Sequence, residues 1–129
     1  MKDDMSQAIA LGRLLRDYRG GAVTVLDLRE TDGWTDFFVI ATVTSATHLL
    51  GLERHVREFS QENGIDILRV SPRPKGTTTA SEDEWLIIDL GTIAVHLMSS
   101  KTRDFYDLER LWDAGAVIFQ ENLTAVPAR

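Results

Sequence analysis

Two apolar runs joined by a single glycine constrain the fold of this chain more than any other feature. Residues 85–90 and 92–98 are apolar at nearly every position, and Gly91 lies between them. So tight a connection predicts an antiparallel hairpin. Strands that are apolar on both faces usually belong to a sheet that is covered on both faces.

The rest of the pattern predicts a mixed α/β fold. Two β-branched runs joined by a short polar segment predict neighbouring antiparallel strands, and apolar residues at three-and-four spacing predict helices. Ser45 is placed to cap the second helix, and Asn63-Gly64 to end it. A strand that follows this helix should return parallel to the strand before it, in a right-handed crossover. We expect a five-stranded mixed sheet (22–28, 36–43, 65–70, 85–90 and 92–98) with about three helices (5–18, 45–62 and 101–112).

Coverage of the sheet has a functional consequence. About three helices are few for covering both faces of five strands. An incompletely covered patch of sheet is therefore a candidate docking surface, and a dimer interface is the competing explanation. The first helix has an apolar stripe wider than half its circumference. It is expected to touch both the core and a second subunit, or to lie deep in its own domain.

Length and composition fit one domain. The chain has 129 residues, 43% of them hydrophobic and 26% charged, and no cysteine. We predict a domain at residues 1–112 and a partly ordered C-terminal extension at residues 113–129. The acidic N-terminus does not resemble a signal peptide, and no apolar run approaches the roughly 20 residues that cross a bilayer. We therefore expect a cytoplasmic protein without membrane contact.

The charge balance favours some partners over others. Fourteen basic against twenty acidic residues leave a net charge of −6. Such a surface repels phosphate backbones, so nucleic-acid contact is expected to be peripheral at most. Arg69, Arg73 and Lys75 are too few, and lack interleaved aromatic residues, to change this expectation. A basic protein partner is compatible, because opposite charge speeds encounter.

The last predicted helix displays a tyrosine. At roughly 100° per residue, Phe105, Leu108, Leu111 and Trp112 cluster on the predicted core face. Tyr106 points away from that face, toward the side of two arginines. Tyrosine and arginine are favoured at binding hot spots, where one residue can contribute about 2 kcal/mol. The alternative is a surface tyrosine that lies over its own helix.

The three histidines do not form a metal site. His48 and His55 are seven residues apart on the second helix, so about 10 Å of helical rise separates their backbones. A zinc ion lies only about 2.1 Å from each ligating nitrogen, so the two cannot easily share one. His96 falls in a strand on the same face as Ala94 and Met98. There we expect a hydrogen-bonded sheet histidine rather than a general base.

Aspartates at strand ends are the remaining candidates for catalysis. A nucleotidyl-transfer site needs two carboxylates close together to hold Mg²⁺. Asp27 and Asp89 each lack a second ligand beside them, and Arg29 would repel the ion. We expect no catalytic residue, metal or cofactor. A residual metal-dependent nucleotidyltransferase that uses Asp27, Asp36 or Asp89 is the alternative from a different functional class.

Three long blocks follow one another along the chain. They are Asp36-Phe-Phe-Val-Ile-Ala-Thr with Thr44-Ser45 and His48, then Glu84-Trp85 through Asp89-Leu-Gly91 to Val95-His96, then Arg103 and Tyr106-Asp-Leu-Glu-Arg-Leu-Trp112. Together they resemble the ribosomal silencing factor family, also called the Iojap-related family, over residues from about 5 to 112. Val43 and Thr92 depart from the residues usual in that family.

The resemblance implies both a fold and a function. The fold would be nucleotidyltransferase-like without the catalytic carboxylate pair. The protein, commonly a homodimer, would bind the large ribosomal subunit through its fourteenth ribosomal protein. It would block joining of the small subunit and so repress translation when nutrients are short. Trp85 and Tyr106 match positions associated with this contact, and Asp107, Leu108 and Glu109 lie in the same signature. A large-subunit assembly factor is the alternative.

Overall fold

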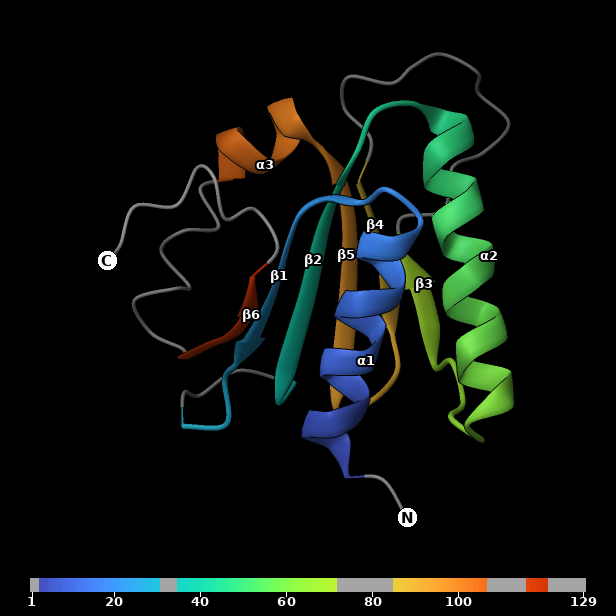
Figure 1. Ribbon diagram of the computed structural model, residues 1–129, viewed down its shortest axis with the longest axis vertical. Coiled ribbons are helices and arrows are strands. Elements are labelled where there is room, and N and C mark those ends of the chain that lie inside the picture. Colours follow the sequence, from blue (N-terminus) through green and yellow to red (C-terminus); the bar gives the residue numbers. More distant parts are fainter. Residues whose placement is uncertain (1–2, 31–34, 72–84, 107–115, 121–129) are drawn as a thin grey trace.

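The structure is a computed structural model that describes residues 3–30, 35–71, 85–106 and 116–120 (Figure 1). Helices and strands alternate irregularly along the chain. In order they are α1 (Asp4–Asp17), β1 (Gly21–Asp27), β2 (Phe37–Val43), α2 (Ala46–Glu62), β3 (Arg69–Ser71), β4 (Trp85–Asp89), β5 (Ile93–Ser99), α3 (Ser100–Tyr106) and β6 (Ala116–Gln120). No helix within these ranges is long and apolar enough to span a bilayer.

The strands form one mixed sheet in the order β3-β4-β5-β2-β1-β6. β2 runs parallel to β5, and the other neighbouring pairs are antiparallel. The predicted mixed α/β class is confirmed, but the predicted count of five strands is wrong. The sixth strand, β6, comes from the proposed C-terminal extension and pairs with β1. The division at residue 112 stays a prediction.

Local patterns predicted the hairpins correctly. β1 and β2 are antiparallel neighbours, as are β4 and β5. At the turn between β4 and β5, Gly91 has a φ of 93°, which a side chain would strain, and its N–H donates to Asp89 Oδ1 at 2.9 Å. Ser45 caps α2 by accepting from the His48 N–H at 3.0 Å. Asn63 and Gly64, with a φ of 67° at the glycine, follow its end.

The crossover after α2 differs from the prediction. β3 runs in the same direction as β2, as expected, but β5 and β4 lie between the two strands. β3 is three residues long and begins only at Arg69. It pairs with β4 at the edge of the sheet, because β5 occupies the place beside β2.

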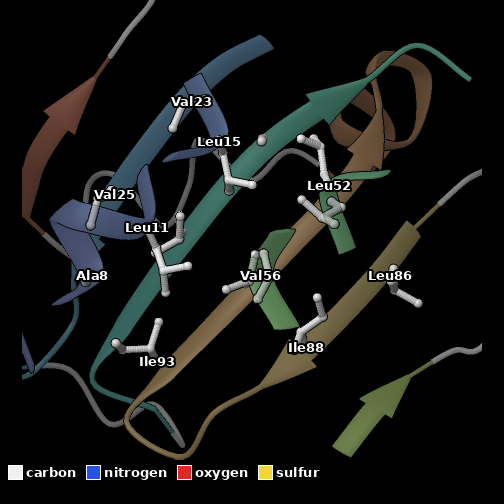
Figure 2. Close-up of a cluster of buried hydrophobic side chains, with 14 of the residues drawn as sticks. Ala8, Leu11, Leu15, Val23, Val25, Leu52, Val56, Leu86, Ile88 and Ile93 are labelled. Carbon is white, nitrogen blue, oxygen red and sulfur yellow. The ribbon is translucent and has the colours of Figure 1, made fainter. Parts of the chain in front are cut away.

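Both long helices cover the same face of the sheet (Figure 1). Leu11 and Leu15 of α1 and Leu52 and Val56 of α2 point toward the strands in Figure 2 and are fully buried or nearly so. Alternate residues of the strands complete this core from the side of the sheet, among them Val25, Val39, Val95 and Ile88. Burial of one such leucine or valine contributes roughly 1.5–3 kcal/mol, so this layer fixes the sheet on which the site is built.

The opposite face of the sheet holds a second buried cluster. It consists of Leu26, Leu28, Phe38, Ile40, Ala94 and Met98. Trp85 and Ile87 of β4 pack against this cluster and are only partly buried. Val117 of β6, which pairs with Leu26 of this cluster, is 41% exposed. Exposed apolar surface on this face therefore lies at β4 and at β6, so the predicted docking patch is not reduced to one strand.

Candidate functional site

Strand pairing places Trp85 beside the start of α3. Trp85 opens β4 and pairs with Met98 of β5, and α3 begins two residues later at Ser100. The predicted site residues Trp85 and Tyr106 therefore belong to elements at the same end of the sheet (Figure 1). The side chain of Tyr106, and all of Asp107, Leu108 and Glu109, lie outside what the structure describes. Their predicted part in a site remains a prediction.

A histidine from the next strand holds the Trp85 indole. Trp85 Nε1 donates a hydrogen bond to His96 Nδ1 at 3.3 Å. The two rings are tilted by 33°, with centroids 6.2 Å apart. On its other side His96 meets Phe38 of β2, whose ring centroid is 4.4 Å away. The predicted hydrogen-bonded sheet histidine is confirmed, on the face predicted for it.

Burial keeps His96 neutral. Its side chain is 4% exposed, and this desolvation lowers the pKa of His96 to about 4. A neutral imidazole has one donor and one acceptor nitrogen. Because Nδ1 accepts from Trp85, the ring proton must lie on Nε2, which is buried without a hydrogen-bond partner among the described residues. His96 is thus a fixed acceptor at neutral pH.

The first turn of α3 is tied to the sheet by polar contacts. Ser99 Oγ accepts from the Thr102 N–H at 3.1 Å, and both side chains are buried. The Arg103 guanidinium donates to the carbonyl of Ala22 and the hydroxyl of Thr42, both at 2.9 Å, and to the hydroxyl of Thr24 at 3.3 Å. Arg103 therefore joins α3 to β1 and β2.

The prediction for Phe105 is wrong. It was placed on the core face, but its side chain is 78% exposed. The helical pattern assumed that residues 101–112 lie along the sheet on one apolar stripe. Instead Thr102 and Arg103, in the first turn, make the described contacts of α3 with the sheet. Residues 107–112, which complete the predicted stripe, lie outside the described ranges.

Loss of the Arg103 contacts should have a measurable cost. We expect Arg103→Ala to lower the free energy of unfolding by about 2 kcal/mol, because hydrogen bonds to a charged group contribute roughly 1.5–3 kcal/mol. Arg103→Lys keeps the charge but loses the planar guanidinium group. Its free energy of unfolding should therefore lie between those of the unchanged chain and Arg103→Ala. Urea unfolding measures the effect. Arg54→Ala, an exposed position on α2, is the matched control and should change stability by less than about 0.5 kcal/mol.

Sequence reasoning missed His96 and Arg103 as parts of the site. Alternation along the strands, combined with the Gly91 turn, places Trp85 and His96 on one face. That signal was present. No local signal could have found the link from Arg103 to Ala22, which joins residues 81 positions apart.

At the other end of the sheet Asp36 lies next to Asp27, since the Asp36 carbonyl accepts from the Leu28 N–H at 2.7 Å, but Asp89 is not brought to them. Asp27 ends β1 and Asp89 ends β4, with β2 and β5 between them. At about 4.8 Å per strand their backbones are roughly 14 Å apart, while each ligand of Mg²⁺ lies within about 2.1 Å of the ion. A hydrogen bond from Arg29 lowers the pKa of Asp27, and the two side chains form an ion pair at 2.7 Å.

Histidines on α2 also have separate neighbours. His48 Nδ1 accepts from the Thr44 N–H at 3.1 Å, near the start of the helix. His55 stacks on Tyr18 of α1 with centroids 3.6 Å apart. Within the described ranges, no three His, Asp or Glu side chains are placed to hold one metal ion.

Comparison with known proteins gives a consistent result. A family described as "Ribosomal silencing factor during starvation" matches residues 2–128. A ribosomal silencing factor from Treponema pallidum is 40% identical over 105 residues, which are 81% of this chain and 88% of the relative. A mouse protein named for mitochondrial assembly of the ribosomal large subunit is 28% identical. The match covers 89% of this chain and 48% of the mouse protein. A crystal structure from Chromobacterium violaceum has a TM-score of 0.75 and 26% identity, and the match covers 98% of this chain and 96% of that one.

Proposed function

Because this chain belongs to the ribosomal silencing factor family, we propose that it represses translation by binding the large ribosomal subunit and blocking its joining to the small one. The contact is with the fourteenth ribosomal protein of the large subunit. Trp85 and Tyr106 anchor it, and Asp107, Leu108 and Glu109 belong to the same surface. The protein acts by occupying space in the cytoplasm, as a homodimer when free, and catalyses no reaction.

The placement of Trp85 carries this proposal. Its indole is half-buried, fixed by a hydrogen bond, and close to the strand end from which α3 starts. Partly exposed tryptophan held in one orientation is typical of binding hot spots, which are enriched in tryptophan and tyrosine. A net charge of −6 suits a basic protein surface. An interface of roughly 1,200 to 2,000 Å² or less would be sufficient.

Cosedimentation tests the proposal. The purified protein should pellet with isolated large subunits and reduce their joining to small ones. Trp85→Ala should raise the dissociation constant for large subunits, measured by pelleting, by about 30-fold. This is equivalent to roughly 2 kcal/mol, because truncation removes a hot-spot side chain. Leu50→Ala is the matched control, since Leu50 is 52% exposed on α2, which covers the opposite face of the sheet.

Two results would count against the proposal. If the protein does not pellet with large subunits at all, the function is wrong. If it pellets but Trp85→Ala binds as tightly as the unchanged protein, Trp85 is not an anchor. Circular dichroism of the variant shows whether the fold is kept.

An assembly factor is the second candidate, and the name of the mouse relative favours it. An assembly factor should be found on immature large-subunit particles and leave before the subunits mature. A silencing factor should bind mature large subunits. Gradient fractions probed for the protein therefore separate the two functions.

A further inference from the structure

One buried side chain governs how Trp85 is presented. We propose that His96 is a positioning residue, which holds the Trp85 indole in the orientation that meets the ribosomal partner. This inference rests on the proposed role of Trp85 in that contact. His96 itself is too deeply buried, at 4% exposure, to touch a partner.

The position of Trp85 explains why it needs a support. It is the first residue of β4 and only partly buried, so fewer neighbours surround its side chain than surround a core residue. Ile87, its neighbour on the same face, is an apolar side chain and offers no hydrogen bond. His96 Nδ1 supplies an acceptor 3.3 Å from the indole nitrogen. A hydrogen bond at the edge of a flat ring restricts its tilt in a way that apolar contact does not.

His96 is in turn fixed from two sides. It lies in β5 among Ala94 and Met98, and the Phe38 ring of the neighbouring strand packs 4.4 Å from its own. A buried imidazole held in this way stays neutral and keeps its acceptor lone pair directed at Trp85. The chain of contacts runs from Phe38 through His96 to Trp85, and ends at the partly exposed surface.

Preorganisation of this kind raises affinity. A large side chain that is already ordered loses less conformational freedom on binding, which is worth about 2- to 10-fold in affinity for one residue. Removal of the His96 acceptor should therefore weaken binding to large subunits by that factor. The indole would remain present and able to make contact, so the loss should be smaller than that of Trp85→Ala.

Two substitutions separate the acceptor from the bulk of the ring. His96→Leu fills a similar apolar volume without an acceptor, and His96→Asn keeps an oxygen near the place of Nδ1. We expect His96→Leu to bind large subunits about 2- to 10-fold more weakly, and His96→Asn to bind within about 2-fold of the unchanged chain. Circular dichroism of both variants verifies the fold before binding is compared.

Nuclear magnetic resonance of the free, full-length protein reads the orientation directly. The indole N–H resonance of Trp85, assigned by its absence in Trp85→Phe, should exchange slowly with solvent in the unchanged chain and in His96→Asn. It should shift and exchange faster in His96→Leu. A variant that was only less stable would speed exchange of all the indole and core amide protons together.

A double-substitution cycle completes the test. In a Trp85→Phe background there is no indole N–H to hold, so His96→Leu should have no further effect on binding. An unchanged indole resonance in His96→Leu would overturn the inference. So would unchanged binding by His96→Leu where Trp85→Ala has lost binding, and in that case the proposed function would still stand. Equal binding by Trp85→Ala would instead reject the anchor and, with it, the role of His96.

Discussion

Replacement of Gly12 by leucine should lower the free energy of unfolding by about 3 kcal/mol or more. Gly12 lies in the middle of α1, where a Cβ atom would stand 2.7 Å from Val25 Cγ2 and 3.2 Å from Phe119 Cδ2. Real Cβ atoms essentially never come within 3.0 Å of another heavy atom, as this one would at Val25, and leucine adds three more carbons. Helix α1 would have to lift away from β1 and β6 to make room. Urea unfolding followed by circular dichroism measures the change.

The same replacement at Gly51 provides a matched control. Gly51 also lies inside a helix, but a Cβ atom there would meet nothing within 4 Å. Leucine at this position should raise stability by about 1 kcal/mol, because glycine is less favourable in a helix interior. The two variants should therefore move in opposite directions. Equal stability changes at the two glycines would show that α1 does not pack on β1 and β6 as closely as the structure has it.

The contact at Gly12 also shows what the sequence pattern could not reveal. Phe119 belongs to β6, a run of five residues that was assigned to a C-terminal extension. Its ring lies against α1, with the guanidinium carbons of Arg13 and Arg16 5.9 and 5.7 Å from its centroid. So short an apolar run after a glycine has no period of its own. Residues 116–120 form a strand because they pair with the edge of β1, and that edge exists only once the rest of the sheet is assembled.

Elements with strong local signals were predicted best. The β4–β5 hairpin follows from two apolar runs and a glycine, and α2 from its stripe, its serine cap and its Asn-Gly end. β3 was predicted in the correct direction but in the wrong place. Strand order is set by pairings across the whole sheet, and β5 pairs with β2 although about fifty residues separate them.

The candidate site was only partly accessible to sequence reasoning. The resemblance to a family pointed to Trp85, and alternation placed His96 on a defined face. The hydrogen bond between them requires the register of the hairpin, which places Trp85 opposite Met98 and Ile87 opposite His96. Phe105 was misplaced because a helical wheel gives the relative direction of side chains, but not which side faces the sheet.

Acidification should destabilise the fold through His96. In the unfolded chain a histidine titrates near pH 6.5, whereas burial lowers the pKa of His96 to about 4 in the folded chain. Between these values the unfolded chain binds a proton that the folded chain does not, so stability falls as the pH falls. The slope is about 1.4 kcal/mol per pH unit, and the total loss is about 3 kcal/mol. Above pH 6.5 and below pH 4 this residue should contribute no further change.

Comparison with His96→Leu isolates this contribution. Urea unfolding at a series of pH values should show the steeper decline in the unchanged chain between pH 6.5 and pH 4. Every other ionisable group is common to both proteins, so its contribution cancels in the difference. Asp27, whose pKa is lowered by Arg29, loses its stabilising effect only at more acidic pH.

Protonation of His96 Nδ1 also removes the acceptor for Trp85, so the indole resonance should broaden or shift near the same pH. Parallel curves for the two proteins would mean that His96 is protonated as readily as in water. It could then not be a buried neutral acceptor, and the basis for its hold on Trp85 would be lost.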